Sequence, residues 1–292
     1  MGGRGRSSGG QTRGVGDLGV DTAVEAVGDG RYAATVSRDW EIWGPMGGYL
    51  ASFALRAAGA EAGERRPTSF SCHYLGVAAF APIEIAVETR KPGRVAQAQR
   101  VSITQEGRPI LDAIAWSTLE VDGLEHDETV PPDVPGPDDL PSAAELAAAD
   151  GAPPFPFWEN LDSRPLDWIS PWPPTGPSPA RWRNWLRFAP TATFADPWID
   201  ACRSLILVDL PSWPAGSRPH AWTEPPFIAP TLDLNVAFHR PTSSEDWLLC
   251  DGAAPLSTGG LLPWNARVWS TSGRLLASGG GQCLYRRTAP PA

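Results

Sequence analysis

The most regular pattern of apolar positions lies between Asp196 and Trp213. Apolar residues recur there at spacings of three and four, which predicts a helix that is buried on most sides. Asp196 and Pro197 favour its start, because aspartate caps helices and proline fits the first helical position. Pro211 favours its end, because the residue before a proline is pushed out of the helical region. The repeating positions are Trp198, Ala201, Cys202, Leu205, Ile206 and Val208.

Asp209 directly follows this apolar run. The C-terminal end of a helix disfavours negative charge, and apolar surroundings disfavour it further. A carboxylate in such an unfavourable place is a candidate catalytic group. The alternative is that Asp209 pairs with an arginine or caps the turn at Pro211.

The same order of elements occurs twice along the chain. One strand precedes a helix, and four strands with alternating or apolar patterns follow it. This repetition indicates a duplication and an α+β fold in which an antiparallel sheet wraps around each helix. The first copy has its helix at 47–60 and strands at 31–38, 68–75, 83–88, 94–105 and 109–120. The second copy has strands at 181–188, 231–240, 247–254, 261–270 and 275–286.

Composition changes between the two copies. Residues 121–179 are rich in proline and acidic residues, which is typical of a linker, with one short helix expected at 143–149. Part of this linker is aromatic and is expected to pack onto the domains. We therefore predict a disordered tail at 1–28, an N-terminal domain at 29–120, the linker at 121–179 and a C-terminal domain at 180–292.

Charge and composition exclude several classes of function. The net charge of −9 argues against a nucleic-acid-binding surface. No apolar run approaches the length of a membrane span, and the start lacks the apolar block of a signal peptide, so we expect a cytoplasmic protein without membrane association. The cysteines lack metal-ligand spacing, which favours reduced, buried thiols and no bound metal. They are Cys72, Cys202, Cys250 and Cys283.

Several short stretches together resemble the acyl-CoA thioesterase II family. The order and spacing of these stretches carry the resemblance, since each is weak alone. They are WGPMGGYL at 43–50, SFSCHYL at 69–75, TLD at 231–233, FHRP at 238–241, EDWLL at 245–249 and GRLLAS at 273–278, followed by Gln282. The resemblance implies a double hotdog fold, an acyl-CoA substrate, no cofactor and assembly into a homo-oligomer.

The same resemblance implies that an Asp, a Thr and a Gln position and activate a water. By position these are Asp209, Thr231 and Gln282. Two departures bear on the match. The segment between Asp209 and Thr231 differs in length from that of the family. Three glycines, at 279–281, place Gln282 about one residue later than the family's glutamine. A slip of one residue turns a side chain to the other face of its strand unless a bulge absorbs the shift.

The chemistry of thioester hydrolysis fits these residue types. A buried carboxylate can act as a base towards water, and backbone N–H groups at a helix start can stabilise an oxyanion. Gly47 and Gly48, preceded by Met46, are therefore expected to contact the substrate. The alternative for the two glycines is tight packing. Asp233 is the rival acid, since alternation places it on the same face as Thr231.

The first copy serves as an internal comparison. Matching the copies places Asp209 opposite Arg56 and Ala57, and Gln282 opposite Trp116, so we predict one active site per chain. His73 and His239 lie in strand patterns and are expected to be structural.

We thus predict an acyl-CoA thioesterase of lipid metabolism that uses Asp-activated water. Two alternatives stay open: a non-catalytic acyl-CoA-binding or scaffold protein of the same fold, and another thioester-processing hotdog enzyme, such as a dehydratase or acyl transferase. The acyl group, and the choice between coenzyme A and an acyl-carrier protein, are not determined by the sequence.

Overall fold

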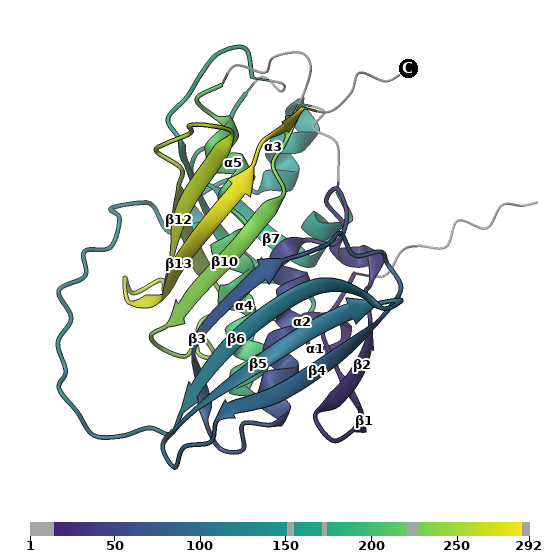
Figure 1. Ribbon diagram of the computed structural model, residues 1–292. Coiled ribbons are helices and arrows are strands. Elements are labelled where there is room, and N and C mark those ends of the chain that lie inside the picture. The colour runs from purple at the N-terminus through teal and green to yellow at the C-terminus, as the bar shows by residue number, and fades with distance from the viewer. Residues whose placement is uncertain (1–14, 151–154, 171–173, 221–226, 288–292) are drawn as a thin grey trace, which may run out of the picture.

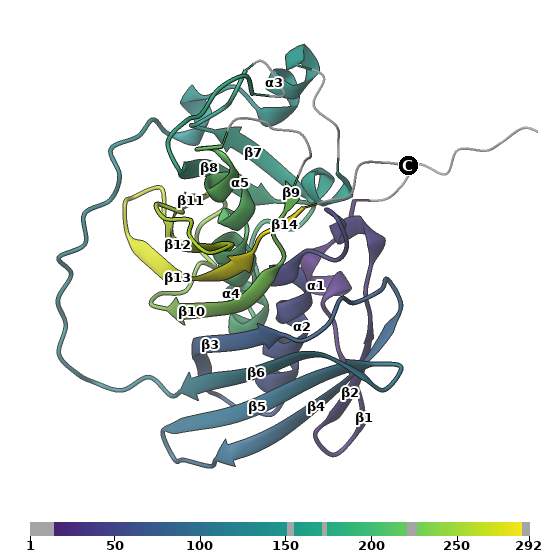
Figure 2. The ribbon, with the colours of Figure 1, turned by 45° about the horizontal axis from the view of Figure 1, so that its top comes forward.

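Twelve strands form one antiparallel sheet that curves around two long helices, α2 (Gly47–Ala60) and α4 (Pro197–Asp209) (Figures 1 and 2). The computed structural model describes residues 15–150, 155–170, 174–220 and 227–287. The strand order is β1-β2-β4-β5-β6-β3-β10-β13-β12-β11-β8-β7, and a separate pair joins β9 and β14. Both ends of the described chain therefore contribute to sheets.

Each element falls in one half of the chain or in the connection between the halves. The first half contains α1 (Leu18–Asp21), β1 (Glu25–Gly28), β2 (Arg31–Thr35), η1 (Arg38–Trp40), α2, β3 (Arg66–Tyr74), β4 (Pro82–Lys91), β5 (Ala96–Gln105) and β6 (Arg108–Thr118). The connection contains η2 (Pro137–Asp139), α3 (Ala143–Asp150), η3 (Pro156–Asn160) and β7 (Leu161–Pro165). The second half contains β8 (Arg181–Phe188), α4, α5 (Ser212–Ser217), β9 (Phe227–Ile228), β10 (Thr231–Phe238), β11 (Leu248–Ala253), β12 (Leu261–Trp269), β13 (Leu275–Leu284) and β14 (Arg286–Arg287).

The two halves meet where β3 pairs with β10. Outward from this seam the order is β6, β5, β4, β2 on one side and β13, β12, β11, β8 on the other, so the halves mirror each other in chain order. Figure 1 shows β3 and β10 side by side at the middle of the sheet. The predicted duplication and the α+β double hotdog architecture are confirmed.

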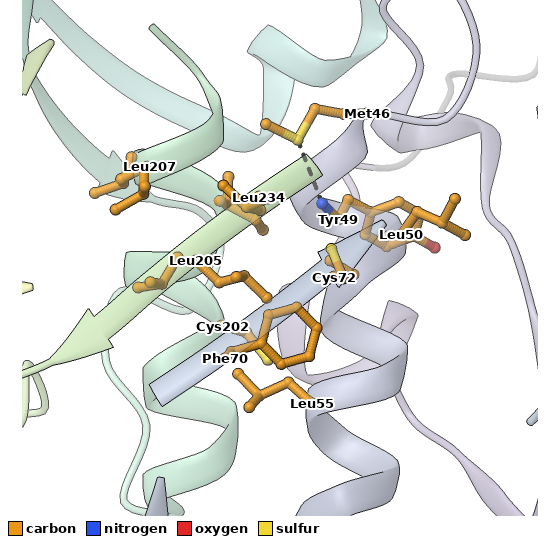
Figure 3. Packing of buried hydrophobic residues seen from close by; sticks show 14 of the residues in the cluster. Met46, Tyr49, Leu50, Leu55, Phe70, Cys72, Cys202, Leu205, Leu207 and Leu234 are labelled. Atoms are coloured by element: carbon orange, nitrogen blue, oxygen red, sulfur yellow. Dashed lines mark hydrogen bonds between the residues drawn. The ribbon is translucent and has the colours of Figure 1, made fainter. Parts of the chain in front are cut away.

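The inner face of the seam packs on the helix pair. Phe70 and Cys72 of β3 and Leu234 of β10 are almost fully buried, and Figure 3 shows them between the two strands and the helices. Alternation produces this arrangement, because every second side chain of a strand points to the same face. The four cysteines are buried and free of disulfides, as predicted.

The two helices approach each other closely at glycines. A Cβ added at Gly48 would lie 2.7 Å from Cα of Ile206, so a larger residue does not fit between the start of α2 and the end of α4. At the opposite end, a Cβ at Gly59 would lie 2.5 Å from Cγ of Trp198. The helices therefore run antiparallel, with the last residue of α4 beside the first turn of α2.

A buried ion pair holds the first turns of α4. Asp200 and Arg203 are 2 % and 0 % exposed, and Oδ1 of Asp200 lies 3.3 Å from Nη1 of Arg203. The Asp200 carboxylate also accepts the backbone N–H of Thr242 at 2.7 Å, and the Arg203 guanidinium donates to the carbonyl oxygens of Thr242 and Glu245. Because these buried charges are paired and hydrogen-bonded, they fix the helix against the loop before β11.

The predicted tail is wrong over its second part. Leu18 of α1 is 1 % exposed, and the N–H of Gly16 donates to Oδ1 of the buried Asn160 at 2.8 Å. Residues 25–28 form β1, at the edge of the sheet. This segment is ordered because it binds a residue far away in the sequence, Asn160, which comes from the connection between the halves. Residues 1–14 of the predicted tail lie outside the described residues.

The predicted linker also contributes to the fold. Its strand β7 pairs with β8 and extends the sheet of the second half (Figure 2). Its segment around Val134 and Leu140 packs on Trp185, Leu249 and Trp269 at the outer face of that half. Residues 151–154 and 171–173 of the linker lie outside the described residues.

Candidate active site

Asp209 is the last residue of α4 and is 4 % exposed. One of its carboxylate oxygens, Oδ2, accepts the backbone N–H of Gly48 at 2.8 Å, and the other, Oδ1, accepts the hydroxyl of Thr231 at 3.3 Å. The carboxylate thus lies at the N-terminal end of α2, where the helix dipole favours negative charge. This neighbouring helix offsets the unfavourable position at the end of its own helix.

Burial raises the pKa of Asp209 from 3.8 to about 6, and the hydrogen bonds from Gly48 and Thr231 oppose that rise. The carboxylate is consequently a stronger base than an exposed aspartate, yet it is ionised near neutral pH. A base of this strength, held by two donors, suits proton abstraction from water.

Thr231 reaches Asp209 because β10 contains a bulge. Thr231 pairs with Cys283 and Asp233 pairs with Gln282, so one extra residue, Leu232, lies in β10 between these pairs. Leu232 is 37 % exposed, while the Thr231 hydroxyl points inward to the carboxylate. The bulge therefore separates the faces of Thr231 and Asp233.

The predicted common face of Asp233 and Thr231 is wrong for this reason. Asp233 is partly exposed and accepts Nδ2 of Asn235 at 3.1 Å, on the outer face of the sheet. Its neighbour Leu234, by contrast, is fully buried on the inner face. Asp233 therefore does not join the site.

Gln282 also faces outward, as the shift of one residue predicts. It is exposed, and it lies opposite Asp233 in the pairing of β13 with β10. The inward position belongs to the fully buried Cys283, whose Sγ lies 3.8 Å from Oγ1 of Thr231. The structure brings together Asp209 and Thr231 but does not bring Gln282 to them.

The glycines at the start of α2 pack tightly against α4 and Asp209, which was one of the two alternatives, while contact of Gly47, Gly48 and Met46 with the substrate stays a prediction. The N–H of Gly48 is occupied by Asp209, and the missing side chain of Gly48 permits the close contact with α4. A Cβ at Gly47 would lie 2.6 Å from Oδ2 of Asp209. Met46 is buried and caps the helix through its sulfur, which accepts the N–H of Tyr49 at 3.3 Å (Figure 3).

Tyr74 and Cys283 also border Asp209, and the sequence reasoning did not select them. Tyr74 lies in the stretch SCHYL, where alternation places it on the same inward face as Cys72. Burial raises the pKa of the Cys283 thiol to about 12, so this group is a neutral thiol near pH 7 and not a nucleophilic thiolate.

The two strand histidines lie away from this cluster. His73 is exposed and is paired across the strands with Asp112 and Asp233, and His239 contacts the Ser278 hydroxyl at 2.9 Å. Within the ranges that the structure describes, no three His, Cys, Asp or Glu side chains converge as metal ligands would. Nor is any helix in these ranges long and apolar enough to cross a bilayer.

The curved sheet, the antiparallel helix pair and a buried acid at their junction define a double hotdog protein. The model of the acyl-CoA thioesterase N-terminal domain matches residues 36–118, and that of the C-terminal domain matches residues 136–283. The chain therefore belongs to the acyl-CoA thioesterase family.

Solved structures with the same fold include three that align over nearly their whole length. An acyl-CoA thioesterase II, TesB2, from Mycobacterium marinum is 22% identical, with a TM-score of 0.75 and coverage of 94% of this chain and 99% of that one. A tesB protein from Mycobacterium avium subs paratuberculosis is 22% identical, with a TM-score of 0.74 and coverage of 95% and 100%. A hot dog fold protein from Alicyclobacillus acidocaldarius is 21% identical, with a TM-score of 0.72 and coverage of 93% and 98%.

Proposed function

We propose that this protein hydrolyses an acyl-CoA thioester to the free acid and coenzyme A, with Asp209 as the general base. The observation that carries the proposal is the buried carboxylate at the junction of two helices, with a pKa raised to about 6 and a donor on each oxygen. Membership of the acyl-CoA thioesterase family supports the substrate class. Such a reaction belongs to lipid metabolism.

The proposed reaction begins with a water next to Asp209. The carboxylate takes a proton from the water while the water oxygen bonds to the thioester carbon. The carbonyl π electrons move onto the carbonyl oxygen. The resulting tetrahedral species collapses, the carbon–sulfur bond breaks, and its electron pair leaves with sulfur. Protonated Asp209 then returns the proton to the thiolate. Thr231 holds the carboxylate in place through its hydrogen bond to Oδ1.

One observation favours a second candidate, a protein of the same fold that binds acyl-CoA without turnover. Gln282, which the resemblance assigns to the water, faces the outer side of the sheet, opposite Asp233. A dehydratase-type reaction has less support, because it would need a histidine and an acid that face the core together. His73 is exposed, and His239 contacts Ser278 near the end of β10.

The test is release of free thiol from a panel of acyl-CoAs that differ in chain length. Asp209→Asn removes the base but keeps the shape of the side chain, so kcat should fall by about a thousandfold or more. Asp233→Asn is the matched control and should keep wild-type activity. Tight acyl-CoA binding without thiol release by the wild-type protein would favour the binding protein instead.

The pH profile provides a second measurement. The base must be ionised, so kcat/KM should rise with pH through a midpoint near the Asp209 pKa of about 6 and level off above it. A rate that is independent of pH between 5 and 8 would contradict Asp209 as the base.

A further inference from the structure

Tyr74 has a buried hydroxyl that makes no well-formed hydrogen bond to any residue that the structure describes. It is the last residue of β3, and its ring is partly buried against the core. The hydroxyl oxygen is enclosed and has no hydrogen-bond partner among the described residues. The Cys72 thiol, on the same strand face, is close enough to this hydroxyl for a weak interaction of hydrogen-bond type, but the pair does not have the geometry of a formed hydrogen bond. Because buried polar groups in proteins are nearly always paired, this one calls for a functional explanation.

The Tyr74 hydroxyl and the Asp209 carboxylate both lie next to Gly47, at the start of α2. The position that a Cβ of Gly47 would occupy lies 2.6 Å from Oδ2 of Asp209 and 3.2 Å from the hydroxyl oxygen of Tyr74. A side chain at residue 47 would therefore crowd both oxygens. Glycine at this position permits the close approach of both oxygens to the first residue of α2.

The donors and acceptors around Asp209 show what this hydroxyl can do. Both oxygens of Asp209 already have a donor, from Gly48 and Thr231. The Gly48 N–H, which the sequence suggested for an oxyanion, is occupied by this carboxylate. The site thus contains a base with its donors in place and one further donor, Tyr74, which makes no well-formed hydrogen bond within the described residues and has only the weakly accepting Cys72 sulfur nearby. Burial also raises the pKa of Tyr74 well above its usual value, which keeps its proton in place at neutral pH.

We propose that the Tyr74 hydroxyl donates a hydrogen bond to the thioester carbonyl oxygen as it becomes negative. This inference rests on the proposed hydrolase function. As water adds to the carbonyl carbon, the electron pair that moves to oxygen is stabilised by the Tyr74 hydroxyl, which keeps its own proton throughout. When the carbon–sulfur bond breaks, the carbonyl re-forms and the hydrogen bond weakens again. Such donors act in enzymes where charge develops in the transition state.

The proposal explains why both halves of the chain are needed for one site. Tyr74 and Gly47 come from the first half, whereas Asp209 and Thr231 come from the second. The pairing of β3 with β10, and the contact of α2 with α4, place them together.

Tyr74→Phe tests the proposal, because it removes one oxygen and keeps the ring. We expect kcat to fall about a hundredfold, the loss typical of one oxyanion donor, with KM changed little. The midpoint of the pH profile should stay where it is in the wild type. Since the lost hydroxyl makes no well-formed hydrogen bond within the described residues, the melting temperature should not fall.

Tyr32→Phe is the matched control. The hydroxyl of Tyr32 donates to Oε1 of Glu61 at 2.6 Å, far along α2 from Asp209, so its loss should lower stability and leave kcat unchanged. This pair of variants separates a catalytic hydroxyl from a structural one.

Two results would overturn the proposal. The first is a Tyr74→Phe protein whose kcat stays within threefold of the wild type. The second is a lower kcat together with a higher midpoint of the pH profile, because the hydroxyl would then act through Asp209 and not on the carbonyl oxygen. The proposed hydrolase fails separately: if the wild type releases no thiol from any acyl-CoA, both proposals fall. Activity that is lost in Asp209→Asn and kept in Tyr74→Phe would overturn only this one.

Discussion

The helix pair has two junctions that are built alike but filled differently. Gly48 and Trp198 are each the second residue of their helix, and Gly59 and Asp209 are each the thirteenth. Gly48 lies against the end of α4, with Asp209 beside it, and Trp198 lies against Gly59. At the first junction, Gly48 lies in the first turn of α2 and Asp209 ends α4. At the second junction, Trp198 lies in the first turn of α4 and Gly59 lies in the last turn of α2.

This difference explains why the described part of α2 contributes no acid to the start of α4 as α4 contributes Asp209 to the start of α2. The Trp198 ring occupies the space above Gly59, and its indole N–H donates to the carbonyl oxygen of Arg65 at 3.0 Å. The first N–H groups of α4 are taken by the Asp196 side chain, which accepts from Trp198 and Ile199. An N-terminus that is capped and covered in this way cannot hold a carboxylate from the other helix.

The comparison also corrects an alignment made from sequence. Matching the copies by pattern placed Asp209 opposite Arg56 and Ala57, whereas the helix positions place it opposite Gly59. The periodicity of a helix leaves such shifts of a turn undetermined, and only the contact between the helices fixes them.

The largest effect is expected from a matched pair of glycine substitutions. Gly48→Ala and Gly59→Ala each place a methyl group into a tight junction, 2.7 Å from Cα of Ile206 or 2.5 Å from Cγ of Trp198. Each should lower the free energy of unfolding by about 1–3 kcal/mol through overpacking, partly offset by the better helix propensity of alanine.

Only Gly48→Ala should also change the chemistry. A displacement of Asp209 by about 1 Å would reduce kcat about a hundredfold, while the folded Gly59→Ala protein should keep its activity. Thiol release per folded molecule, with folding followed by chemical denaturation, distinguishes the two. Equal losses of activity would show that the junctions do not differ in function.

A second effect, of similar size in stability, is expected in its dependence on pH. A pKa raised from 3.8 to about 6 means that the folded protein holds a proton that the unfolded chain has released. Stability is therefore lost as pH rises between these values, by up to about 3 kcal/mol, and the loss is complete above pH 6.

In Asp209→Asn the side chain at residue 209 does not ionise, so this loss of stability with rising pH should be absent. The variant should match the wild type in stability near pH 4 and exceed it by about 1–3 kcal/mol at pH 8, while lacking activity. Urea unfolding at both pH values measures the difference. A variant that is less stable than the wild type at pH 8 would argue against a raised pKa.

The smallest changes in kcat are expected from two substitutions in the sheet, one of an inward-facing residue and one of an outward-facing residue. Thr231→Val keeps the shape but loses the hydroxyl that bonds to Asp209, so kcat should fall about tenfold and the midpoint of the pH profile should rise. Gln282→Ala removes an exposed side chain on the outer face and should change kcat less than twofold. A large loss in Gln282→Ala would place that amide in the reaction despite its orientation.

Local patterns determined much of the fold from sequence alone. The apolar spacing from Trp198 to Val208, the cap at Asp196 and the alternating strands predicted α4 and the central strands within a few residues of their bounds. These features depend on neighbours within one or two turns, which the sequence displays directly. The choice of Asp209 also came from local chemistry, since an acid at the end of a buried helix needs compensation.

Only the tertiary structure decided which groups meet Asp209. The bulge at Leu232 turned Thr231 inward and left Asp233 outside, and the register of β13 placed Cys283 where Gln282 was expected. The Gly48 N–H and the Tyr74 hydroxyl come from the other half of the chain. Strand facing depends on register at the level of one residue, and contacts between halves depend on how two helices and two strands pack, so neither is encoded in a local pattern.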